Sequence, residues 1–344
     1  MADINTVSDT LGIPWEVEKD IPFGEVAPFI GFFWDLANCT VSLPDSKKQK
    51  YLQAVQEWES KPKHTLDKAQ KLYGKLLHAC HIIPAGCAYL TSLEAFIGIC
   101  HDSPFCLRYP PHRTPSDLSW WKERLTQPDV IRPIPGPLPI FNTDAYSDAS
   151  SETGIGITVR GRWRAWRLLP GWKADGRDIS WAEAVGFWLL IITLSLSTPK
   201  GTHIKVFGDN RGVVEGWWKG RSRNKPTNDI SKHIHALAEA QDVHFHTRYV
   251  PSKENPADGP SQGKYYHNSL LLAVVIPQTL RQHICDFDTP LTPAESCLVQ
   301  QEKAAVPLPR SDHASLQCEQ TAVDHAFEQH ARATFDQTQG WLDG

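Results

Sequence analysis

The order of strand-like and helix-like segments between residues 141 and 258 leaves few possible folds. Three strand-like runs come first, with tight, Gly-containing connections: 141–150, 154–160 and 163–169. A long apolar helical pattern follows at about 181–196, and two more strand-like runs, 203–208 and 243–250, alternate with helical patterns. Three antiparallel strands followed by crossover-linked strands predict an α/β fold, a mixed five-stranded sheet with flanking helices.

A proline-rich segment divides the chain. Five of residues 128–140 are Pro, which predicts an extended, semi-rigid linker. In 1–127 we expect two strands, 29–36 and 40–44, turning at Ala37-Asn38, and then four helices. The helical patterns are 45–59, 65–82, about 86–100 and 116–127. Beyond 141–265, we expect the tail 266–344 to hold an apolar helix at 270–284, a flexible acidic region and a short helix at about 321–338.

The composition is that of an intracellular protein, cytoplasmic or nuclear, without a membrane segment. The longest apolar run, 187–197, is too short to cross a bilayer, and the N-terminus lacks a secretory signal pattern. The eight Cys form no C-x-x-C pair, which favours reduced thiols. The segment 141–265 carries 17 Lys and Arg against 13 Asp and Glu, although the whole chain has a net charge of −4.

Four acidic residues stand at the ends of predicted elements. Asp148 ends the first strand of the sheet, Asp209 ends the fourth, and Asp258 follows the fifth. Glu183 lies in the first turn of the long apolar helix. Because strands one, four and five are expected to be neighbours, we expect the three Asp at one edge of the sheet with Glu183 over the same place.

Clustered carboxylates suit a metal-dependent reaction. They repel one another and raise their own pKa values unless cations neutralise them. Mg²⁺ prefers carboxylates together with phosphate oxygens and water, and two ions can activate a water and stabilise the leaving oxygen in phosphodiester cleavage. The pattern therefore predicts a site for two Mg²⁺ or Mn²⁺ ions.

Each acid also has an ordinary structural interpretation. Ser180 and Glu183 fit a helix capping box, and Asp209 could cap the helix at 211–219. Asp258 suits the first turn of a helix that opens at Asn255-Pro256, and Asp148 suits a turn. The structure must decide between these interpretations.

Four motifs resemble the ribonuclease H domain of retrotransposon reverse transcriptases, fungal elements in particular. They are DASSETGIGI, WAEAVGFWLL, VFGDNRGVVEGW and RYVPSKENPADGPSQG, in this order, within about 140–265. The resemblance implies an RNase H-like sheet with strand order 3-2-1-4-5. It also implies that Asp148, Glu183, Asp209 and Asp258 are the catalytic metal ligands and that the substrate is an RNA–DNA hybrid. Residues 1–127 resemble the palm end, thumb and connection of such enzymes.

The chain departs from this family in several places. It has no Y-x-D-D polymerase motif, so we expect no DNA synthesis by this chain alone, and a separate polymerase chain is a candidate partner. The loop VPSKEN lacks the His that many cellular members carry. His244 and His246 lie in the fifth strand instead, where alternation puts them on one face, and we expect a structural role for them. Pro260 shortens the helix that carries Asp258.

Two groups of basic residues are candidates for contacting phosphates, since a hybrid is recognised through its backbone and 2′-hydroxyls. The loop group is Lys219, Arg221, Arg223 and Lys225, and the strand group is Arg162 and Arg164. Lys47, Lys48 and Lys50 begin a helix in 1–127 that could contact a primer–template. Solvated surface cations are the structural alternative in every case.

The leading hypothesis is a divalent-metal ribonuclease H derived from a retroelement. The alternative is a catalytically inactive or host-adopted nucleic-acid-binding remnant. A third hypothesis, a transposase- or integrase-like enzyme with the same sheet topology, is disfavoured by the ADGPS segment at 257–261.

Overall fold

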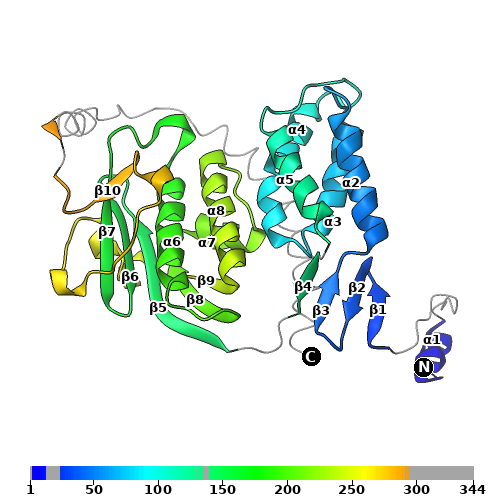
Figure 1. The fold of residues 1–344 in the computed structure, drawn as a ribbon, viewed down its shortest axis with the longest axis horizontal. Helices are drawn as coiled ribbons and strands as arrows, with labels where there is room; N and C mark the ends of the chain where they lie inside the picture. Colours follow the sequence, from blue (N-terminus) through cyan, green and yellow to red (C-terminus); the bar gives the residue numbers. More distant parts are fainter. Residues whose placement is uncertain (1, 13–23, 129, 135–138, 291, 294–344) are drawn as a thin grey trace. The chain divides into compact units, whose positions relative to one another are not determined.

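The computed structural model describes residues 2–12, 24–128, 130–134, 139–290 and 292–293 (Figure 1). The described residues as far as Thr289 form one compact unit. The helix predicted at about 321–338 lies outside the described residues. Among the described residues, no helix is long and apolar enough to cross a membrane. The first helix is α1, Ala2–Leu11.

The N-terminal sheet has four antiparallel strands in the order β1-β2-β3-β4. They are β1 Val26–Phe29, β2 Phe32–Asp35, β3 Thr40–Ser42 and β4 Ile131–Pro133. The strand predicted at 29–36 is wrong, because the chain reverses at Ile30-Gly31, where both residues have positive φ, and Phe29 pairs with Phe32. Such a two-residue turn matches the twist of the paired strands. The proline-rich segment 128–140 was expected only to connect the two parts of the chain. In the structure it also contributes strand β4 to this sheet.

Four α-helices and a 3-10 helix pack on one another beside this sheet. They are α2 Asp45–Glu59, α3 Leu66–Ala79, η2 Pro84–Tyr89, α4 Thr91–Cys100 and α5 Thr114–Thr126. Their shared core includes Val55, Leu76, Phe96 and Trp121. Lys48 is buried, and its Nζ donates to the carbonyls of Gln127 and Pro128 at 3.1 and 2.8 Å. Lys48 therefore holds α2 to the end of α5 and is not a surface cation.

The second sheet has six strands rather than the five predicted. Its order is β10-β7-β6-β5-β8-β9. The strands are β5 Ile140–Ala149, β6 Gly154–Val159, β7 Arg162–Leu168, β8 Thr202–Gly208, β9 Val243–Tyr249 and β10 Ile284–Asp286. β8 runs parallel to both β5 and β9, and the other pairings are antiparallel. The carboxyl ends of β5 and β8 therefore meet at one edge, because Ser147 pairs with Gly208.

The helices of the second sheet are α6 Ile179–Ser195, α7 Arg211–Lys219, α8 Lys225–Gln241 and α9 Asp258–Ser261. Single 3-10 turns lie at Ala174–Gly176 (η3), Ser252–Glu254 (η4), Asn268–Leu270 (η5) and Gln278–Leu280 (η6). α6 is apolar around its whole circumference because it lies between the sheet and α8. Its Glu183 is the only acid between its first and last residues, and it is buried.

The helix predicted at 270–284 is also wrong. This stretch forms η5, η6 and then β10, which pairs with β7. Pro277 is the physical reason, because it lacks the N–H and blocks a continuous helix. The apolar residues Leu272, Leu280 and Ile284 still reach the core of the second sheet, so the chain beyond residue 265 completes this sheet.

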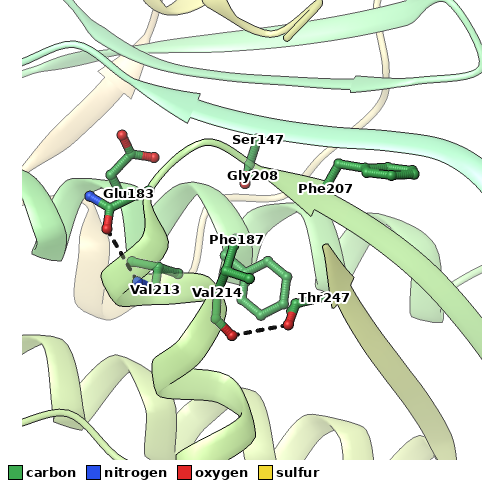
Figure 2. Close-up of a pocket in the computed structure, with 9 residues that line it drawn as sticks. Ser147, Glu183, Phe187, Phe207, Gly208, Val213, Val214 and Thr247 are labelled. Atoms are coloured by element: carbon green, nitrogen blue, oxygen red, sulfur yellow. Dashed lines mark hydrogen bonds between the residues drawn. The ribbon is translucent and has the colours of Figure 1, made fainter. Parts of the chain in front are cut away.

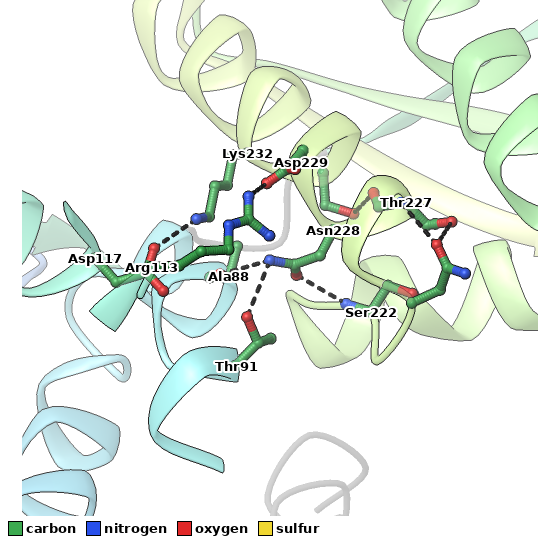
Figure 3. Close-up of polar contacts among 11 residues, drawn as sticks. Ala88, Thr91, Arg113, Asp117, Ser222, Thr227, Asn228, Asp229 and Lys232 are labelled. Atoms are coloured by element: carbon green, nitrogen blue, oxygen red, sulfur yellow. Dashed lines mark hydrogen bonds and ion pairs between the residues drawn. The ribbon is translucent and has the colours of Figure 1, made fainter. Parts of the chain in front are cut away.

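Polar side chains connect α8 and the loop before it to the N-terminal helices (Figure 3). Asn228, 1% exposed, donates to the carbonyl of Ala88 at 2.7 Å and accepts from the backbone N–H of Ser222. Lys232 pairs with the buried Asp117 at 2.7 Å. Buried polar groups that are fully paired specify one geometry, so these contacts fix α8 against η2 and α5.

Candidate metal centre

Asp148 lies at the end of β5, in the centre of the sheet. It is 5% exposed and pairs across to Gly156 of β6. Its Oδ2 accepts a hydrogen bond from the hydroxyl of Ser261. An acid that is buried in a strand and hydrogen-bonded from another element is not an ordinary turn residue, so the turn interpretation of Asp148 is wrong.

Asp209 follows β8 directly and does not cap the next helix. Asn210 is the N-cap of α7, and its side chain accepts from the N–H of Val213 at 3.2 Å. Oδ1 of Asp209 is buried and has no hydrogen-bond partner in the part of the chain that the structure describes. A buried carboxylate oxygen without a donor is costly, which indicates that something else satisfies it.

Glu183 is likewise not part of a capping box. Asp178 caps α6 by accepting from the N–H of Trp181 at 3.1 Å, so Ser180 does not hold the cap position. Glu183 is 7% exposed, which places it among the few acids that are buried at all. Its position on α6 brings it to the edge where β5 and β8 end.

The three acids converge. One carboxylate oxygen from each of Asp148, Glu183 and Asp209 lies within 4.8 Å of the other two. We call these three residues the acidic triad. The sequence placed them on a strand end, a helix and a second strand end, and the parallel pairing of β5 and β8 brings them together.

The triad is electrostatically unfavourable without a cation. The pKa of Asp148 is raised to about 7, mainly by burial and also by the charges of Asp209 and Asp258, while the hydrogen bond from Ser261 lowers it. Burial also raises the pKa of Glu183 to about 9, helped by the charges of Asp148 and Asp209. Three carboxylates with an unpaired buried oxygen are the donor set that hard divalent cations such as Mg²⁺ and Mn²⁺ prefer.

Asp258 does not join the triad within 4.8 Å. It begins α9, is partly buried, and its Oδ1 accepts from the side-chain amide of Gln262 at 2.7 Å. The charge of Asp258 still affects the triad electrostatically, because it raises the pKa of Asp148. Asp258 is therefore near the triad, but Gln262 already occupies one of its oxygens.

The residues that hold α9 against the sheet were missed by sequence reasoning. Ser261 is fully buried, and Asn255 donates to the carbonyl of Ser147 at 3.0 Å. Gly156 makes this close approach possible, because a Cβ there would lie 2.6 Å from the backbone N of Ser261. The short helix is thus tied to β5 on both sides of Asp258, next to Asp148.

A small cavity of about 10 Å³ lies beside the triad (Figure 2). Glu183 and Ser147 are on its wall, and its other side is apolar, with Phe187, Phe207 and Val214. The carbonyl of Val214 accepts from the Thr247 hydroxyl at 3.0 Å, which joins α7 to β9 below it. A space of this size holds about one water molecule and has no room for an organic cofactor.

The predicted phosphate-binding residues have mixed surroundings. Arg221 is held inside the fold, paired with Glu94 and donating to the hydroxyl of Tyr73. Lys219 forms an exposed pair with Glu215 at 3.5 Å. Arg223 and Lys225 are exposed. Within the loop group, Arg221 therefore joins the segment between α7 and α8 to α3 and α4. Lys219, Arg223 and Lys225 lie at the surface.

The strand group is engaged by the segment that follows α9. Arg162 donates to the carbonyl of Leu271, and Arg164 pairs with Asp286 of β10. Arg164 also lies over the ring of Phe287 at 5.6 Å. The prediction of phosphate contacts here did not foresee these contacts with Leu271, Asp286 and Phe287, although Arg162 itself stays exposed.

Comparisons with known proteins add little. No family model matches the chain, and no curated protein matches it. Among solved structures, a foamy viral protease–reverse transcriptase in complex with double-stranded DNA matches with a TM-score of 0.25 and 13% identity. The match covers 65% of this chain and 38% of that one, so this chain spans well under half the length of the viral protein.

Proposed function

We propose that the chain is a divalent-metal-dependent endoribonuclease that cleaves the RNA strand of RNA–DNA hybrids and derives from a retroelement. The observation that carries the metal-dependent part is the acidic triad, with its buried, unpaired Asp209 oxygen. The choice of hybrid as substrate and of a retroelement origin rests on the four sequence motifs.

In this proposal, Asp148, Glu183 and Asp209 hold the ions, and Asp258 completes the second site. Bound ions would neutralise the triad, activate the attacking water and stabilise the leaving 3′ oxygen. The hydroxyl of Ser261 holds Asp148 in place by donating to its Oδ2. Burial limits the access of bulk water to the acids. The proposed contacts to substrate phosphates are Lys219, Arg223 and Lys225.

Cleavage of an end-labelled RNA strand annealed to DNA tests the proposal. With Mg²⁺ or Mn²⁺ the wild type should cut the RNA of the hybrid but not single-stranded RNA or duplex DNA. Asp209→Asn should lose at least about 100-fold in rate, because removing even an outer partner of a metal site costs about 10–100-fold. Asp175→Asn, an exposed acid on η3 whose side chain is 81% exposed, is the matched control and should keep full activity.

A non-catalytic nucleic-acid-binding protein is the second candidate. It is favoured by one observation, that Asp258 lies outside the triad and bonds to Gln262. Hybrid binding in a gel shift that needs no metal, together with wild type and Asp209→Asn equally inert in the cleavage assay, would support this candidate and rule out the nuclease.

A further inference from the structure

Three histidines gather on β8 and β9, away from the triad. His203 pairs directly across to His244 in the parallel register, and His246 lies two residues further along β9. Residues two apart on a strand face the same side, and so do direct cross-strand neighbours. One face of the β8–β9 pair therefore carries all three imidazoles.

The rings are in contact. Nδ1 of His203 and Nε2 of His246 are 2.8 Å apart, and this hydrogen bond requires a neutral ring as acceptor. The ring of His203 stacks on that of His244 with centroids 4.5 Å apart. His203 is 8% exposed, whereas the side chain of His244 is 47% exposed and so has room to turn.

We propose that His203, His244 and His246 bind a divalent transition metal of the Zn²⁺ class. Two nitrogens on a tetrahedral zinc stand roughly 3.3 Å apart, since each Zn–N bond is about 2.0–2.1 Å. The His203 and His246 nitrogens are 2.8 Å apart and would separate slightly on binding. The three histidines do not bring their nitrogens within 4.8 Å of one another in the structure, so a side-chain rotation of His244 must supply the third donor. An H-x-H pair on one strand with a third His on its neighbour can reach a single ion above the sheet.

The surroundings favour borderline metals over Mg²⁺. All three donors are imidazole nitrogens, which suit Zn²⁺, Co²⁺, Ni²⁺ and Cu²⁺, whereas Mg²⁺ takes oxygen ligands. Asp242 provides one carboxylate nearby, with Oδ1 3.8 Å from Nε2 of His244. The histidines and Asp242 line a cavity of about 680 Å³, so an ion there is reachable from outside the sheet.

This site is distinct from the acidic triad. His203 precedes Asp209 by six residues on the same extended stretch, which places them roughly 20 Å apart at about 3.3 Å per residue. The two sites also differ in donor type. Zinc-class binding at the histidines and Mg²⁺ binding at the carboxylates can therefore be removed separately.

Calorimetric titration of the chelator-treated full chain with Zn²⁺, and absorption spectra with Co²⁺, test the proposal. We expect one ion per chain with the visible bands of a low-coordinate Co²⁺ site. His244→Ala should weaken binding by at least about 100-fold, since loss of an outer partner alone costs about 10–100-fold. His246→Ala should do the same. Circular dichroism confirms that each variant is folded.

Two controls make the outcome decisive. His101→Ala removes a histidine whose side chain is 84% exposed and should leave binding unchanged. Asp209→Asn removes the triad and should also leave Zn²⁺ affinity unchanged, whatever it does to hybrid cleavage. If the wild type takes up no stoichiometric Zn²⁺ or Co²⁺, or if His244→Ala and His246→Ala bind as tightly as wild type, the histidines only pack the strands together and the proposal is wrong.

Discussion

Replacing Glu183 by Gln should make the metal-free protein progressively more stable relative to wild type as the pH rises. Gln keeps the shape of the side chain but removes its titration. The pKa of Glu183 is about 9 in the folded chain against an ordinary value of 4.5, so the folded state binds this proton more tightly than the unfolded state. Stability from a raised carboxyl pKa is present at low pH and is lost as pH rises from the unfolded toward the folded value.

The magnitude follows from these two values. Between pH 5.5 and pH 8 the unfolded Glu183 is ionised while the folded one is still mostly protonated. At about 1.36 kcal/mol per pH unit, the wild type should lose up to about 3 kcal/mol relative to Glu183→Gln across this interval. Any constant cost of the Gln substitution cancels, because only the change between the two pH values counts.

Urea unfolding of both proteins in EDTA at the two pH values measures this change. Repeating it with Mg²⁺ at pH 8 should stabilise the wild type more than the variant, because a ligand that binds only the folded state adds stability with its concentration. A gap between wild type and variant that stays constant from pH 5.5 to 8 would refute the electrostatic reasoning for the triad.

Two further predictions concern the supports of the site, and a third concerns the contact of α8 with η2. Gly156→Ala should detach α9 and lower both cleavage and stability, because the added Cβ meets the backbone of Ser261 at 2.6 Å; unchanged melting and activity would contradict this. Ser261→Ala should raise the Mg²⁺ concentration for half-maximal cleavage several-fold, since Asp148 loses its donor; an unaltered Mg²⁺ titration would argue against that role. Asn228→Ala should cost about 1–3 kcal/mol in urea unfolding, because it leaves the buried carbonyl of Ala88 unpaired.

The sequence was informative where one local signal determines the structure. Alternating strands with helical patterns located β5 to β9, and helix bounds at 45–59 and 211–219 agree with α2 and α7. The acids of the triad were found because Asp148 and Asp209 stand at strand ends and Glu183 lies near the start of a long apolar helix. Their capping alternatives could be excluded only with coordinates, since Asp178 and Asn210 are equally good caps in sequence.

Other features depend on contacts between distant segments. The pairing of β10 with β7 joins residues that are more than 100 positions apart in the sequence. The local sequence at 284–286 contains no pattern that predicts this pairing. Arg164 was predicted to be available for phosphates because its ion-pair partner, Asp286, is remote in sequence. Nothing in the sequence singles out Ser261, which follows Pro260 in a short helix. Its role follows from the contact with Asp148, which the absence of a side chain at Gly156 allows.

The pairing of β10 with β7 has a practical consequence for work on isolated fragments. A fragment that stops at residue 265, just after the last motif ends at Gly263, would lack β10 and leave the backbone N–H and C=O groups of β7 open along one side. Open edge strands recruit strands of other molecules and promote aggregation. The same fragment would lose Leu280 and Ile284 from the core. A fragment that extends to Thr289 keeps the short edge strand β10 beside β7. Poor solubility of shorter pieces would then reflect a missing strand rather than an unstable catalytic centre.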